Sequence, residues 1–212
     1  MSGILDLLGS NLGKSIISGV SGSAGTDESK TSAALTMALP VLMTAMKRNA
    51  ATPKGAEGLM GALNGKHDGS ILDNLGGLFG GGVDDNVKQE GDKILSHVLG
   101  DKQSGVEKII SEKSGLDAAS IANILKISAP ILMGVVGRQS KQDNMNSSGD
   151  LSGMLGNFIG GNDMKEEQNF LEKILDAGGD GSVVDDVASM VLGKAGGKKG
   201  GLGGLLGGLF GK

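Results

Sequence analysis

Apolar residues recur every three or four positions along most of this chain, and no stretch alternates apolar and polar residues with period two. The stripes with helical spacing cover residues 3–20, 59–63, 71–79, 94–99, 106–110, 151–159 and 202–210. This spacing is typical of amphipathic helices that place one face on a core. The aromatic and β-branched residues that favour strands are scarce, with four Phe and no Trp or Tyr. The pattern predicts an all-α, multihelical protein.

Two segments differ from these stripes because they are apolar on nearly every side. Residues 35–43 and residues 125–133 share the pattern Leu-x-x-x-x-Pro-[Val/Ile]-Leu-Met, and Pro40 and Pro130 are 90 residues apart. A helix that is apolar all round is buried, and a proline inside it removes one hydrogen bond and kinks the helix. We therefore expect two related helical repeats, each built around a buried, proline-kinked helix.

The repeat divides the chain into three parts. Residues 1–90 form the first helical repeat, and residues 91–192 form a second repeat that packs on the first. The division lies in the polar, acidic stretch 83–92. Residues 193–212 combine a Gly/Lys linker with a short amphipathic tail helix.

Local signals predict where several helices begin. Asp27 and Asp117 precede the two buried helices as N-caps, and Thr52 precedes Pro53 in the order typical of N-cap and first helical residue. Ser70 with Asp73 has the layout of a capping box. The second buried helix is expected to run through Val136 and to be followed by a polar loop over 139–149.

Composition limits the chemistry. The chain has no Cys, which excludes disulfides and thiolate metal sites, and its net charge of −4 gives no general attraction to nucleic acid. The first residues lack the pattern of a signal peptide, and the longest apolar run, about 33–46, is shorter than the roughly 20 residues that span a bilayer. We expect a soluble, cytoplasmic protein.

The two histidines are the obvious candidates for catalysis. His67 lies in the turn before Ser70, and His97 lies in a helical pattern between Leu95 and Val98. Neither has a partner at metal-ligand or triad spacing, and the chain has no nucleophile elbow and no phosphate-binding loop. We predict a non-enzymatic protein without a cofactor; an enzyme with an unrecognised site is the less favoured alternative.

One loop imitates a calcium site. It has acidic residues at positions 1, 5, 10 and 11, and they are Asp176, Asp180, Asp185 and Asp186. Positions 3 and 12 hold Gly178 and Val187, so two side-chain ligands are missing. The related element at 68–73 shares only the Ser-x-x-Asp pattern, which favours a helix cap over a metal site.

The C-terminal stripe is the candidate for self-association. Its apolar positions follow the spacing i, i+3, i+4, i+7 and i+8, and they are Leu202, Leu205, Leu206, Leu209 and Phe210. A short, glycine-rich helix is not stable alone in water, so it needs a surface to dock on. Docking on a neighbour predicts a homo-oligomer that could extend into a filament, and docking on its own body predicts a monomer.

Lysines close to this stripe leave a second interpretation open. They are Lys194, Lys198, Lys199 and Lys212, and they would suit binding to an anionic membrane surface.

Several motifs together resemble one family. They are the Leu-Pro-Val-Leu core helix, the connection at 49–53, the segment 67–72 and the Asp-Gly-Ser-Val-Val-Asp-Asp element at 180–186. In combination they resemble the YidB-like family of bacterial proteins of unknown function. The resemblance implies a multihelical fold of the orthogonal-bundle type, and it implies no activity, substrate or catalytic residue.

Overall fold

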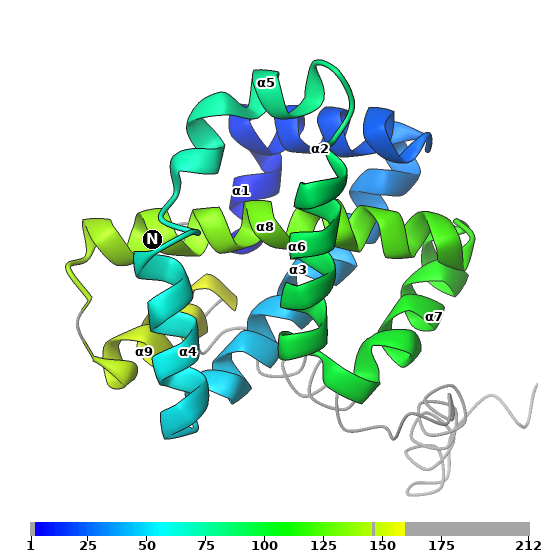
Figure 1. Ribbon diagram of the computed structural model, residues 1–212. Helices are drawn as coiled ribbons and strands as arrows, with labels where there is room; N and C mark the ends of the chain where they lie inside the picture. Colours follow the sequence, from blue (N-terminus) through cyan, green and yellow to red (C-terminus); the bar gives the residue numbers. More distant parts are fainter. Residues whose placement is uncertain (1–2, 146, 160–212) are drawn as a thin grey trace, which may run out of the picture.

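The computed structural model describes residues 3–145 and 147–159, which are helical with no strand among them (Figure 1). The α-helices and the two 3₁₀ helices follow one another as α1 (Ile4–Gly9), α2 (Asn11–Ala24), α3 (Glu28–Ala50), α4 (Pro53–Asn64), η1 (Ser70–Asn74), α5 (Leu75–Phe79), α6 (Asp85–Val98), η2 (Gly100–Lys102), α7 (Gln103–Ser114), α8 (Ala118–Gln142) and α9 (Ser148–Ile159). The predicted all-α, multihelical fold is confirmed.

The single helix predicted over residues 3–20 is wrong, because the chain forms α1 and α2 with a break at Ser10. The Ser10 side chain accepts a hydrogen bond from the Gly13 backbone at 3.1 Å and so caps a new helix. A Cβ at Gly13 would lie 2.1 Å from the Leu7 carbonyl oxygen, so the tight corner requires glycine there. α2 then runs on to Ala24 and ends at Gly25, which has a φ of +66°.

The predicted caps of the two long helices are confirmed. Asp27 accepts a hydrogen bond from the Lys30 backbone at 3.0 Å, and Asp117 accepts one from the Ser120 backbone at 2.9 Å. A glycine with positive φ ends the preceding helix in both cases, Gly25 before α3 and Gly115 before α8. These turns match at the same 90-residue offset as the prolines; a duplicated unit would produce this match, and the duplication itself stays a prediction.

α3 and α8 supply most of the fully buried core. α8 runs across the middle of the molecule, with α6 crossing it on one side (Figure 1), and it also contacts η1, α2, α4 and α7. α3 packs most extensively on α9 and α7. Pro40 and Pro130 are both buried within these helices, and the buried Thr44 hydroxyl donates to the Pro40 carbonyl oxygen at 2.8 Å. The Thr44 hydroxyl therefore has its partner within its own helix.

The proposed boundary between residues 90 and 91 lies inside α6, so the polar stretch that predicted it is the first half of a packed helix. At Gly91 a Cβ would lie 1.8 Å from the Lys126 carbonyl oxygen of α8. Ile94 and Leu95 on the same helix are buried, and Lys126 forms an ion pair with Asp92 at 3.0 Å between Nζ and Oδ1. α6 thus spans the predicted boundary, and its second half packs directly on α8.

α8 is longer than predicted. It continues beyond Val136 to Gln142, and α9 begins at Ser148, so the connection is shorter than the loop predicted over 139–149. Among the described residues, α8 alone has the length and apolar composition of a possible membrane span. Within its most apolar stretch, 72% is buried against the rest of the protein, and a core helix of a soluble protein meets the same criterion.

Candidate functional site

Two of the sequence candidates, His67 and the pair Ser70 and Asp73, lie in residues 66–73, the segment after α4 that leads into η1, which we call the 66–73 turn. It rests against α6 and α8. α4 ends at Asn64, and the His67 backbone N–H donates to the Ala62 carbonyl oxygen at 2.9 Å, which folds the chain back after the helix. The His67 side chain is buried in this turn, with 7% of the residue exposed.

His67 faces a carboxylate on α6. Its Nε2 lies 3.2 Å from Oε1 of Glu90, and the other oxygen of Glu90 accepts from Lys66 Nζ at 2.5 Å. Burial lowers the pKa of His67; the hydrogen bond and charge of Glu90 oppose this shift, and Lys66 adds to it. The hydrogen bond from Lys66 lowers the pKa of Glu90 against the effect of burial. A neutral His67 beside an ionised Glu90 is the state that this geometry favours near neutral pH.

Two cations of α8 hold the other side of the turn. Arg138 donates to the Gly69 carbonyl oxygen at 2.9 Å and also binds the Asp73 carboxylate. Lys141 Nζ lies 2.7 Å from Oδ2 of Asp68, and this contact, with hydrogen bonds from Ser70, lowers the pKa of the Asp68 carboxyl well below its usual range. The turn is therefore attached to α8 at three points.

The predicted capping box of Ser70 and Asp73 is wrong. Ser70 begins a 3₁₀ helix without a side-chain cap, and its backbone N–H donates instead to Asp68 Oδ1 at 3.0 Å. The Asp73 carboxylate accepts a hydrogen bond from Arg138, which is distant in sequence. The Asp-Gly pair that precedes Ser70 was the sequence signal for this turn, because Asp side chains bind the backbone two residues later.

Two glycines allow the turn to lie on the backbone of α8. A Cβ at Gly137 would be 1.8 Å from the His67 carbonyl oxygen, so no other residue fits without displacement. Gly69 has a φ of +99° and lies beside Arg138. Backbone contact and ion pairs together fix the position of His67.

The charged residues of the 66–73 turn are arranged to hold the turn on α6 and α8, and not to act on a substrate. A His–Glu pair can act as a general base, but here each charged group of the turn is bound by another charged or backbone group of the same cluster. The part of the chain that the structure describes holds no group of three His, Asp or Glu residues placed to bind a metal. His97 lies apart from this turn, exposed near the end of α6, with Nδ1 3.2 Å from the Lys93 carbonyl oxygen.

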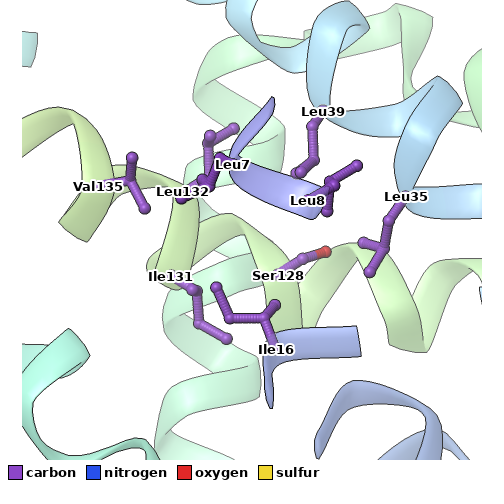
Figure 2. Close-up of a pocket in the computed structure, with 9 residues that line it drawn as sticks. All are labelled: Leu7, Leu8, Ile16, Leu35, Leu39, Ser128, Ile131, Leu132 and Val135. Atoms are coloured by element: carbon purple, nitrogen blue, oxygen red, sulfur yellow. The ribbon is translucent and has the colours of Figure 1, made fainter. Parts of the chain in front are cut away.

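A small apolar pocket lies beneath α1 (Figure 2). Its walls come from α1, α2, α3 and α8, and the lining side chains are Leu7, Leu8, Ile16, Leu35, Leu39, Ser128, Ile131, Leu132 and Val135. Ser128 is the polar member, and its hydroxyl donates to the Ile124 carbonyl oxygen within α8. The space is about 10 Å³, at most enough for one water molecule, so this pocket is a packing defect of the core.

The calcium-like acids Asp176, Asp180, Asp185 and Asp186 lie outside the described residues, as does the tail stripe of Leu202, Leu205, Leu206, Leu209 and Phe210. The structure therefore brings together His67 and the residues around Ser70 from the sequence candidates. Sequence reasoning missed Glu90, Arg138 and Lys141 as partners, because they lie between 23 and 73 residues away from the turn residues that they contact.

Comparison with known families gives a match that covers more than half of the chain. A family described as bacterial protein of unknown function, DUF937, matches residues 6–139, which include the 66–73 turn and nearly all of α8. No curated protein and no solved structure matches the chain.

Proposed function

The chain belongs to the DUF937 family of bacterial proteins of unknown function, as its YidB-like motifs indicated, and from this premise we propose that it is a non-enzymatic self-assembly protein. Its contact element is the C-terminal stripe, residues 202–210. The assembly is homotypic, and a head-to-tail arrangement of copies extends into a filament when the rotation between them does not close a ring.

The observation that carries this proposal is the burial of the apolar face of α9. Its apolar residues have the same spacing as the tail stripe, i, i+3, i+4, i+7 and i+8, and all five are at most 7% exposed: Leu151, Met154, Leu155, Phe158 and Ile159. In this protein a short helix with that spacing is a docked helix. The tail stripe has the same spacing, so as a helix it would have an apolar face of comparable size, and that face would require a surface of its own.

The site geometry supports a non-enzymatic role. His67 is buried between α6 and α8, the Glu90 carboxylate that faces it is also bound by Lys66, and the pocket beneath α1 is apolar and too small for a substrate. The ion pairs hold the 66–73 turn in place, the pocket is a packing defect, and neither feature presents a reacting group to a ligand. A membrane-surface role through Lys194, Lys198, Lys199 and Lys212 is the second candidate.

The test compares two full-length double variants with equal changes in charge. Leu209→Asp/Phe210→Asp adds two negative charges on the stripe, and Lys198→Gln/Lys199→Gln removes two positive charges from the linker. At near-millimolar chain concentration, where association is expected, light scattering should give a monomer mass for the first variant and the wild-type mass distribution for the second. Equal masses for wild type and Leu209→Asp/Phe210→Asp at that concentration would contradict self-assembly.

Co-sedimentation with anionic liposomes addresses the second candidate. Under the assembly proposal the protein stays in the supernatant. Pelleting that is lost in Lys198→Gln/Lys199→Gln and at high salt would favour the membrane-surface role instead.

A further inference from the structure

The sequence Leu-Gly-Gly-Leu-Phe-Gly occurs twice in this chain, at residues 75–80 and again at residues 206–211. The first copy forms α5 and the glycine that follows it. The second copy lies in the C-terminal stripe, outside the described residues. The structure therefore shows one copy of this hexapeptide together with the surface on which it rests.

That surface is α2, which lies beneath α5 at the outer edge of the molecule (Figure 1). The Phe79 ring sits directly on the backbone of Gly19: a Cβ added at Gly19 would lie 2.2 Å from Cδ2 and 2.4 Å from Cγ of the ring. The missing side chain of Gly19 thus creates a notch that fits one aromatic ring. We call this surface of α2 the Gly19 notch.

α5 occupies the notch with little to hold it there. The helix has five residues and none of them is fully buried; Leu75, Leu78 and Phe79 are only partly covered. It is followed by three glycines, of which Gly82 has a φ of +85°. A short, partly exposed element between such joints opens locally at a small fraction of the free energy of global unfolding.

We propose that the Gly19 notch is the docking site for residues 206–211 of a second copy of this chain, with Phe210 in the place of Phe79. This inference rests on the proposed function and names the surface that the tail binds. The same six residues make the same contacts, and exchange of an identical element between copies is a low-cost route to association. The tail also carries Leu205 at the position of Asn74, which adds an apolar side chain next to the shared sequence.

The two copies of the hexapeptide compete for one notch, and this competition determines how strong the association is. α5 is tethered next to α2, which corresponds to an effective concentration of about millimolar or more. Association of the wild-type chain through this notch is therefore weak at micromolar concentration and increases as the protein approaches millimolar. Removing the Phe79 ring frees the notch for Phe210. A larger residue in place of Gly19 fills the notch and excludes the rings of both Phe79 and Phe210.

Sedimentation equilibrium of full-length variants tests these two consequences. Phe79→Ala is expected to tighten association by about tenfold or more, because it removes the tethered competitor. The double variant Phe79→Ala/Phe210→Ala is expected to return to monomer, which separates specific docking from aggregation of a loosened body. Gly19→Leu is expected to be monomeric, and its control on the same helix is Gly22→Leu, where an added Cβ meets no atom within 4 Å.

Far-UV circular dichroism serves to check that each variant keeps its helix content. Association that is unchanged in Phe79→Ala, that survives the added Phe210→Ala, or that persists in Gly19→Leu would overturn the notch as the docking site. If Gly19→Leu still associates while Leu209→Asp/Phe210→Asp is monomeric, the tail docks elsewhere and the proposed function stands. If Leu209→Asp/Phe210→Asp associates like wild type, the proposed function fails as well.

Discussion

The contact between α6 and α8 makes a sharp prediction about Gly91. Replacing Gly91 by Ala would place Cβ 1.8 Å from the Lys126 carbonyl oxygen, 2.7 Å from its carbonyl carbon and 2.9 Å from its Cα. All three atoms belong to the backbone of a long helix, so none can rotate away. α6 must move outward by about 1.2 Å to reach the 3.0 Å below which such contacts are essentially not found.

Gly91→Ala costs stability because the buried side chains of α6 move outward together with the helix. Ile94 and Leu95 are 8% and 0% exposed, and a gap of about 0.5–1 Å already removes a quarter to a half of the dispersion energy of such contacts. Overpacking of this kind costs about 1–3 kcal/mol. The intrinsic helical gain from Gly to Ala is about 0.5–1 kcal/mol, so Gly91→Ala is expected to be destabilising overall.

Gly61→Ala in α4 is the matched control, because an added Cβ there meets no atom within 4 Å. This variant should show the helical gain alone and become more stable by about 0.5–1 kcal/mol. Urea unfolding is followed by circular dichroism at a helical wavelength, since the chain has neither Trp nor Tyr for fluorescence. A Gly91→Ala variant as stable as Gly61→Ala would refute the close backbone contact between α6 and α8.

Three further predictions test other parts of the fold. Leu42→Ala and Leu132→Ala, both at most 2% exposed, should each lower the free energy of unfolding by about 2–5 kcal/mol in urea titrations; a loss below 1 kcal/mol in either would contradict the buried core. Thr52→Ala, which removes the cap of α4 at 3.1 Å from the Gly55 N–H, should cost about 0.5–2 kcal/mol, and Thr52→Ser should retain most of it. Because the pKa of His67 is lowered from its ordinary 6.5, the unfolded chain binds the proton more readily; stability is full above pH 6.5 and is lost as pH falls through the lowered value. The decrease between pH 7 and pH 5.5 should disappear in His67→Gln, and an unchanged decrease would assign it to other groups.

Much of the fold could be predicted because its signals are local. The apolar spacing and the residues before each helix, such as Asp27, Thr52 and Asp117, act within one or two turns, and the structure uses them as caps. Ser10 shows the limit of this reasoning: the stripe of α1 continues in phase into α2, and only a capping serine separates the two helices.

Long-range contacts explain the remaining differences. Ser70 and Asp73 have the spacing of a capping box, but Arg138, far along the chain, takes the Asp73 carboxylate and leaves Asp68 to bind the Ser70 N–H. Glycines give a second example. Gly61 and Gly91 both lie inside helices, and the sequence alone does not distinguish them. Only Gly91 is required, because the backbone of α8 lies against it, whereas an added Cβ at Gly61 meets no atom within 4 Å.

The most direct test of self-assembly is the molar mass of the full-length wild-type chain, measured by sedimentation equilibrium from micromolar to near-millimolar concentration. One chain has a mass of 21.2 kDa. Assembly through a tail that competes with a tethered copy predicts a mass near this value in dilute solution, which rises steadily with concentration. A mass of 21.2 kDa at every concentration would contradict it.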